Sequence, residues 1–479
     1  MATVQPGGAR PGRLAELFLL LFALALSFMA YAQVALALQG HLPPQMALQC
    51  GGFTLLTLGL HLVVRWRAPY ADPVILPVTV LLNGTGLAMI YRLALRYQAT
   101  DTDPGWLIAP KQMVWTVLGI VAAATLLICL RDHRVLRRFT YTAMLLGLAG
   151  LIAPLLPVIG DTRNGSTIWI HLWEFSFQPA EVSKILLVVF LAGYLVTRRE
   201  AMALAGPKIA GLQLPRLRDM GPLLTAWLAS LGVLVFEKDL GTSLLLFGVF
   251  VVILYTATNR PSWIVIGLGL FAGGIYLAYR LFGHVAQRVE AWLHPFDQAI
   301  YDQVGGSHQL AQGLFGLAHG GLFGTGLGRG RPDITPMAYS DFIFAALGEE
   351  LGLTGVMGLL LVYLILVERG FRTAIGIRDG FGKLLATGLT FTLAFQFFVV
   401  VGGVTRVIPL TGLVTPFLAY GGSALLANWV VVALLLRISD GARRPPPATS
   451  EIDLSSLVQA DKPKPKVESV GALEAVSRP

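Results

Sequence analysis

Charged side chains are scarce in this chain. Asp, Glu, Lys and Arg make up 13% of its 479 residues, while 55% of the residues are hydrophobic. A soluble domain carries about 25% charged residues, and the mean hydropathy here is +0.68. The composition therefore excludes an ordinary soluble domain and indicates a protein of the lipid bilayer.

Cysteine pairs, metal-ligand spacings and nucleotide loops are also lacking. The two cysteines, Cys50 and Cys129, form no spaced framework, which argues against a disulfide scaffold or a zinc site. The eight histidines show no metal-ligand spacing, and no glycine loop of the phosphate-cradling type opens a helix after a strand. ATP hydrolysis by this chain is thereby disfavoured. We attribute the formal charge of +9 to basic membrane loops and expect no nucleic-acid partner.

Apolar runs of about 20 residues recur along the chain and predict an all-α polytopic membrane protein. The first run is long enough to span the bilayer and a second follows at once, so we interpret it as an anchor and not as a cleaved signal peptide. About twelve spans are expected, at residues 14–38, 45–64, 73–91, 112–130, 139–159, 179–196, 222–236, 240–258, 263–282, 342–367, 383–403 and 412–436.

Basic residues are concentrated in alternate loops, for example in 131–138 and 198–218. Because Lys and Arg favour cytoplasmic loops, we expect these loops and both termini to be cytoplasmic. The segment 283–341, which we expect to form a long glycine-rich loop between the ninth and tenth spans, is then extracellular. The leader 1–12 and the Pro-, Ser-, Lys- and Glu-rich tail 439–479 are expected to be disordered and cytoplasmic. The tail either binds a partner protein or has no binding role.

The most prominent candidate residue is Asp341, which ends a glycine-rich stretch and heads an apolar helix. An ionisable group at the mouth of a membrane helix is a functional candidate. Burial would raise its pKa and nearby arginines would lower it, a combination that suits a general base. Alternatively, Ser340-Asp341 caps the helix. Glu349 and Glu350 follow about two turns further on.

Other polar stretches lie where the bilayer or its edge is expected. Trp169 belongs to an aromatic belt that leads into the sixth span. Glu181 and Lys184 share one face of that span, either as an ion pair that orients helices or in contact with substrate. Asp239 either caps the eighth span or lines a substrate cavity. The polar stretch 402–423 predicts non-helical backbone, which at membrane depth requires a cavity or protein cover.

Two arginines are expected outside the membrane. Arg288 lies beside aromatic residues and is suited to hold a diphosphate or an acidic sugar by forked hydrogen bonds, or else it is a solvated loop charge. Arg329 adds positive charge within the glycine-rich stretch, against the prevailing charge bias. We expect the cavity at 402–423 to open outward and to face Asp341.

Several long segments resemble one family. They are QPAEVSK (178–184), EKDLGTS (237–243), QRVEAWLHPF (287–296), GGLFGTGLG (320–328), SDFIFAALGEELGLTG (340–355) and IPLTGLVTPFLAYGGSAL (408–425). In this order, over residues 73 to 438, they resemble the shape, elongation, division and sporulation (SEDS) family of RodA and FtsW. The resemblance implies a peptidoglycan glycosyltransferase that polymerises lipid II at the outer face of the cytoplasmic membrane, with a class B penicillin-binding protein as partner.

The resemblance also implies roles for individual residues. Asp341 matches the family's catalytic aspartate, and Asp239 matches the aspartate of its PDLG-type motif. Arg288 and Gln312 match cavity positions. The remaining matches are to a conserved tryptophan and an intramembrane ion pair, here Trp169, Glu181 and Lys184.

The chain departs from the family pattern at Lys238, at Ile168 and at Val401-Gly402-Gly403. The family core has ten spans, so the two spans in 13–72 are extra and resemble actinobacterial RodA-like forms. An FtsW-like role in division, a lipid II flippase and a scaffold without enzymatic activity remain alternatives. A divalent cation, Mg²⁺ or Mn²⁺, is compatible with the reaction, although no ligand cluster indicates one.

Overall fold

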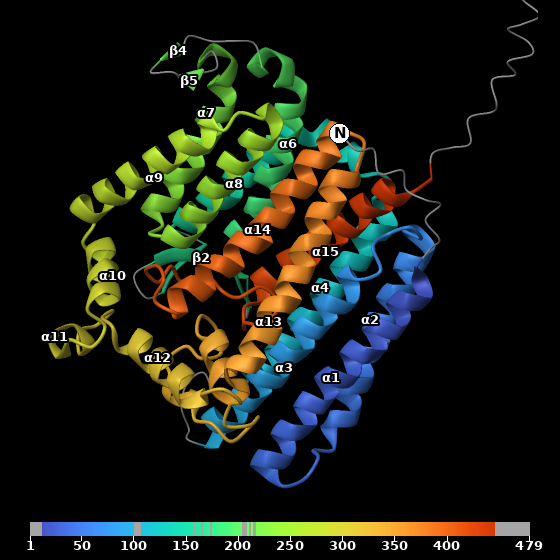
Figure 1. Ribbon diagram of the computed structural model, residues 1–479, viewed down its shortest axis with the longest axis vertical. Coiled ribbons are helices and arrows are strands. Elements are labelled where there is room, and N and C mark those ends of the chain that lie inside the picture. Colours follow the sequence, from blue (N-terminus) through green and yellow to red (C-terminus); the bar gives the residue numbers. More distant parts are fainter. Residues whose placement is uncertain are drawn as a thin grey trace, which may run out of the picture. The chain divides into compact units, whose positions relative to one another are not determined.

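The computed structural model describes residues 12–99, 107–157, 159–163, 166–172, 175–203, 208–209, 212–213 and 217–445. Long helices dominate this part of the chain (Figure 1). They are α1 (Arg13–Gln39), α2 (Gln45–Arg67), α3 (Ile75–Ala99), α4 (Ile108–Cys129), α5 (Thr140–Ile152), α6 (Ala180–Ala203), α7 (Leu217–Phe236), α8 (Leu240–Thr258), α9 (Ser262–Leu281), α13 (Ile343–Gly376), α14 (Gly380–Val404) and α15 (Gly422–Arg443).

The predicted all-α membrane fold is confirmed. Among the described residues, 11 helices are long and apolar enough to cross a bilayer, and the apolar part of α7, Leu223–Phe236, is shorter. The last predicted span was placed too early, because 405–421 is irregular and α15 begins at Gly422. The same helix continues to Arg443, so 439–443 is helical and not part of the tail. The leader 1–11 and the tail from 446 onward lie outside the described residues.

The helices pack in two connected groups. On one side α1 packs against α3, α2 against α4, and α4 against α15, while α13 contacts both α3 and α15 (Figure 1). On the other side α5 packs against α6, and α14 contacts α6, α8 and α13. Helix α15 is central, since 83% of its apolar window is buried, whereas only 6% of that of α9 is buried. Helix α9 therefore presents most of its apolar surface outward.

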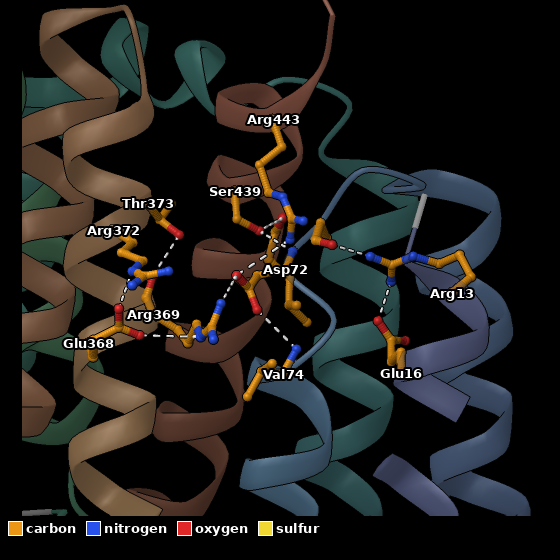
Figure 2. Close-up of polar contacts among 12 residues, drawn as sticks. Arg13, Glu16, Asp72, Val74, Glu368, Arg369, Arg372, Thr373, Ser439 and Arg443 are labelled. Carbon is orange, nitrogen blue, oxygen red and sulfur yellow. Dashed lines mark hydrogen bonds and ion pairs between the residues drawn. The ribbon is translucent and has the colours of Figure 1, made fainter. Parts of the chain in front are cut away.

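The two N-terminal helices are joined to the rest of the bundle by polar contacts near residue 72 (Figure 2). The Asp72 carboxylate forms ion pairs with Arg369 (3.6 Å) and Arg443 (3.4 Å), and the Asp72 N–H donates to Ser439 Oγ (3.0 Å). Arg13 pairs with Glu16 on α1 and donates to a carbonyl of the α2–α3 connection. The helices that precede residue 72 are thus fixed to α13 and α15.

Short strands, which the sequence analysis did not predict, lie between α5 and α6. Strands β1 (Gly160–Arg163), β2 (Ser166–Leu172) and β3 (Phe175–Phe177) form an antiparallel sheet in the order β1-β2-β3. Trp169 lies in β2, opposite Asp161 of β1. The run of β-branched and aromatic residues there favours strand over helix. A second pair, β4 (Lys208–Ile209) and β5 (Leu212–Gln213), is also antiparallel.

The segment between α9 and α13 is not one long loop, contrary to the expectation for its glycine-rich part. It contains α10 (Gly283–Leu293), α11 (Gln298–Tyr301) and α12 (His308–Gly320), followed by the 3₁₀ turn η3 (Pro332–Ile334). Helix α12 packs against α13. The irregular backbone is therefore confined mainly to 321–342, and α12 gives it a rigid support.

Candidate active site

A tight turn places Asp341 directly before α13. The backbone N–H groups of Ser340 (3.0 Å) and Phe342 (3.2 Å) both donate to the carbonyl of Met337, whose φ is 55°. Phe342 is 1% exposed and anchors the turn. The N-cap position of α13 is Phe342, without a side-chain cap. Asp341 therefore does not cap the helix, and its Oδ1 instead accepts from Ser340 Oγ (2.7 Å).

Arg288 approaches the same place from α10. Its Nη1 donates to the carbonyls of Leu410 (3.4 Å) and Thr411 (3.2 Å), which belong to the irregular segment 405–421. A second pair of contacts holds α10 nearby, since Trp292 Nε1 donates to the Arg406 carbonyl (3.1 Å) and Arg406 Nε donates to the Trp292 carbonyl (2.9 Å). These contacts fix α10, and with it the Arg288 guanidinium, against 405–421.

A hollow of about 450 Å³ lies between these elements. It is lined by α10, by 304–306, by the start of α12, by the turn at Asp341 and by 410–412. Both Asp341 and Arg288 face it. The sequence predicted a cavity between 402–423 and the Asp341 turn, and the structure has a cavity there. The half-buried Asp341 carboxylate and the Arg288 guanidinium thus line one hollow, which is large enough for a sugar ring and its phosphate groups.

The ionisation of the two groups is coupled. Burial raises the pKa of the Asp341 carboxyl above its usual value, while the hydrogen bond from Ser340 and the charge of Arg288 act to lower it. Burial also lowers the pKa of Arg288, and the carboxylates of Asp239 and Asp341 act to raise it. Since an arginine remains charged in proteins, Arg288 is a fixed cation between two carboxyl groups.

Asp239 precedes α8 and caps it. Capping was one of the two roles that the sequence predicted for this residue. Its Oδ1 accepts from the Thr242 N–H (2.9 Å), whereas its buried Oδ2 has no hydrogen-bond partner among the described residues. Burial raises the pKa of Asp239, and nearby Arg288 acts to lower it. Neighbouring Glu237, which sequence reasoning missed, is 1% exposed, and burial together with Asp239 raises its pKa to about 8. Glu237 is therefore mostly protonated at neutral pH.

The predicted pair on α6 is formed and buried. Lys184 Nζ donates to Glu181 Oε2 (2.5 Å) and to Gln396 Oε1 of α14 (2.9 Å). Gln396 in turn donates to the carbonyl of Val414 (2.9 Å). The pair thus connects α6 through α14 to the irregular segment that forms one wall of the hollow. This arrangement agrees with the helix-orienting alternative; Lys184 and Glu181 do not line the hollow itself.

Glu349 and Glu350 hold the glycine-rich segment in place. Glu349 Oε1 accepts from the Arg331 N–H (2.7 Å), and Glu350 Oε2 accepts from the Gly328 N–H (2.9 Å). Gly324 (φ 80°) and Gly352 (φ 68°) lie so close that a Cβ on Gly352 would come within 2.2 Å of the Gly324 nitrogen. At these two positions glycine is required for backbone packing and not for access to a ligand.

Arg92, which was not predicted from the sequence, also holds the glycine-rich segment in place. Arg92 is fully buried on α3, and its guanidinium pairs with Glu350 (2.6 Å) and Asp333 (3.1 Å). It also donates to the Gly330 carbonyl. The partners lie about 240 to 260 residues further along the chain, so no local pattern could have indicated the pairing.

Three predicted residues lie away from the lining of the hollow. Gln312 on α12 donates to the Tyr301 hydroxyl (2.8 Å). Arg329 is exposed, and Trp169 lies in β2. None of the three lines the hollow as the described residues form it. Their contact with substrate stays a prediction.

Fold and site together define a multi-pass helical membrane protein in which a half-buried carboxylate and an arginine line one hollow. A family model described as cell cycle protein, covering FtsW, RodA and SpoVE, matches residues 73–444. The chain therefore belongs to the FtsW, RodA and SpoVE family. The match begins beside α3, so α1 and α2 precede it.

Individual relatives agree with this assignment. Peptidoglycan glycosyltransferase RodA of Mycobacterium tuberculosis is 52% identical over 437 residues, which are 90% of this chain and 92% of the relative. The Mycobacterium leprae protein of the same name is 48% identical and covers 93% of this chain and 95% of its own length.

Two solved structures are similar. One is described as the structural coordination of polymerization and crosslinking by a peptidoglycan synthase complex. It matches with a TM-score of 0.61 and 25% sequence identity, and the match covers 78% of this chain and 99% of the chain in that structure. The other is a mutant of Thermus thermophilus rod shape determining protein RodA, with a TM-score of 0.56, 26% identity and the same coverage of both chains.

Proposed function

We propose that this chain is a peptidoglycan glycosyltransferase that polymerises lipid II into glycan strands for cell elongation. The observation that carries the proposal is the position of Asp341 and Arg288 in one hollow, within a chain 52% identical to a relative named peptidoglycan glycosyltransferase RodA. The RodA names of the mycobacterial relatives support a role in elongation over an FtsW-like role in division.

In the proposed reaction Asp341 acts as the general base. Its carboxylate takes the proton from the sugar 4-hydroxyl of one lipid II molecule, and that oxygen attacks the anomeric carbon of a second, lipid-linked chain. The new C–O bond forms as the bond to the diphosphate oxygen breaks, so configuration inverts in a single displacement. Because burial raises the carboxyl pKa, the deprotonated Asp341 is a stronger base than a solvated aspartate.

Arg288 is proposed to stabilise the leaving undecaprenyl diphosphate. Its guanidinium is held by two backbone carbonyls, so it needs little reorganisation as charge develops on the departing oxygen. Exposed Arg329 is a candidate for a second contact with the diphosphate. Within the described residues no group of three or more His, Cys, Asp or Glu is arranged to hold a metal ion.

The proposed location is the cytoplasmic membrane, with both termini cytoplasmic and the hollow at the outer face. The concentration of basic residues in alternate loops supports this orientation. A class B penicillin-binding protein is the proposed partner, which the similarity to a chain from a peptidoglycan synthase complex supports. Accessibility labelling of single cysteines at residues 302 and 378 tests the orientation, since only the first should react from outside.

The enzymatic test is polymerisation of labelled lipid II by the purified chain with candidate partners. Asp341→Asn should abolish glycan chains, whereas Asp302→Asn, an exposed aspartate of the same segment, should leave them unchanged. A flippase would instead move lipid II across vesicles, with no glycan formed by either protein. Normal chain formation by Asp341→Asn would contradict the proposed role of Asp341.

A further inference from the structure

A second hollow, of about 360 Å³, lies where α6, the α13–α14 connection and the start of α14 approach the 3₁₀ helix η1 (His133–Phe139). Three arginines line it: Arg134 and Arg137 from η1, and Arg378 from the α13–α14 connection. Val196 of α6 and Phe381 of α14 supply apolar lining. None of these residues contributes to the hollow at Asp341.

The lining carries an excess of positive charge. Its one carboxylate, Asp379, accepts from the Gly382 N–H (2.7 Å) and bonds to His133 Nε2 (2.8 Å), and Arg134 is 3.6 Å away. Burial acts to raise the pKa of Asp379, but hydrogen bonds from His133 and Gly382 lower it to about 2. Asp379 is thus ionised, and its oxygens are already occupied by groups other than Arg137 and Arg378.

Arg137 and Arg378 have no side-chain hydrogen bond or ion pair with any residue that the structure describes. Both are exposed and reach the hollow from different segments of the chain. Two convergent guanidinium groups with free donors match the geometry of a phosphate, which accepts forked hydrogen bonds.

Exposed apolar side chains follow η1 along the chain. Phe139 at the end of η1 is 53% exposed and Tyr141 on α5 is 55% exposed, and Leu145 and Leu146 follow on the same helix. Aromatic residues at such a position mark the level of lipid headgroups, with acyl chains alongside the apolar helix. An occupant with a phosphate at one end and hydrocarbon at the other fits both features.

We propose that this hollow binds the headgroup of an anionic phospholipid of the bilayer, with its phosphate held by Arg137 and Arg378. Basic pockets between membrane helices on the cytoplasmic side are suited to such headgroups. The bound lipid connects η1 to the α13–α14 turn, two segments that are otherwise joined here through the contacts of Asp379. The proposal is independent of the chemistry at Asp341.

The test uses the full-length chain and native mass spectrometry with phosphatidylglycerol and phosphatidylcholine. The wild type should retain phosphatidylglycerol in preference to phosphatidylcholine. The double variant Arg137→Gln/Arg378→Gln should lose more than about tenfold in affinity for phosphatidylglycerol, because it removes both guanidinium groups that would form hydrogen bonds to the phosphate.

The matched control is Arg131→Gln/Arg138→Gln, which removes the same charge from the same region at exposed arginines that do not line the hollow. It should bind phosphatidylglycerol as the wild type does. Equal losses in the two double variants, or no lipid preference in the wild type, would overturn the proposal. Binding of inorganic phosphate as strong as that of the lipid would also overturn it, since the site would then serve a soluble anion. Single variants Arg137→Gln and Arg378→Gln replace the double variant if it does not fold.

Discussion

Asp341 and Arg288 come from different elements, the turn before α13 and helix α10, and line the same hollow. Each acts on the ionisation of the other, since Arg288 lowers the pKa of Asp341 and Asp341 raises that of Arg288. Burial has the larger effect on the pKa of Asp341, and the charge of Arg288 partly offsets it. In the proposed reaction the same guanidinium stabilises the negative charge that develops on the leaving diphosphate.

The pH profile of polymerisation should report this coupling. A general base works when deprotonated, so the rate should fall as the pH drops through the raised pKa of Asp341. Arg288→Gln removes a charge that lowers that pKa, and the acidic limb of kcat/KM should move to higher pH. Arg331→Gln, at an exposed arginine outside the hollow, should leave the limb in place. An acidic limb that stays fixed in Arg288→Gln would show that the two groups are not coupled.

Substitutions at Asp239 should distinguish a helix-capping role from a role in the site. Asn caps helices about as well as Asp, so Asp239→Asn should keep the thermal stability of the protein, whereas Asp239→Ala should lose about 1 kcal/mol. If the free Oδ2 charge serves the site, Asp239→Asn should still lower the polymerisation rate. Equal activity of Asp239→Asn and the wild type would leave Asp239 with the capping role alone.

The Glu181–Lys184 pair should behave as a structural unit. Lys184→Met leaves a buried carboxylate without its cation and should cost about 3–5 kcal/mol of stability. The double variant Glu181→Leu/Lys184→Met replaces the pair by apolar groups and should recover most of that loss. Thermal unfolding in detergent measures both. Recovery of polymerisation in the double variant would assign the pair to helix orientation; stability without activity would assign it to substrate contact.

Arg92 should be needed to keep the glycine-rich segment in place. Arg92→Met leaves Glu350 buried and unpaired, so both stability and polymerisation should fall, the former by roughly 3–5 kcal/mol. The Arg331 side chain is exposed, and Asp333 keeps its pair with Arg92 when Arg331 is replaced. Arg331→Gln should therefore change stability by less than about 1 kcal/mol. Limited proteolysis within 321–335 provides a local readout, and unchanged protection in Arg92→Met would refute the role.

Hydropathy predicted most of the fold because membrane spans are long apolar runs, whereas the orientation derived from basic residues stays a prediction. The irregular segment 405–421 was recognised from its Pro, Gly and polar residues, but the start of α15 was placed ten residues too early. The strands around Trp169 were missed, since apolar runs at a membrane edge do not distinguish strand from helix by length alone.

The individual candidate residues were less predictable than the fold. Asp341 was found because a carboxylate beside an apolar run is costly, and the Glu181–Lys184 pair was found because helix spacing is local. The role of Arg92 could not be predicted from the sequence, because its partners are brought to it only by tertiary packing. The spacing of the glycines near 324 did not reveal their role, which the structure shows to be close backbone contact.

The most direct measurement is the length distribution of glycan made from labelled lipid II by Asp341→Asn in the presence of its penicillin-binding partner. Wild type and Asp302→Asn should give long chains, and Asp341→Asn should give none while it still folds and binds lipid II. Glycan of normal length and amount from folded Asp341→Asn would contradict the assignment of this carboxylate as the base.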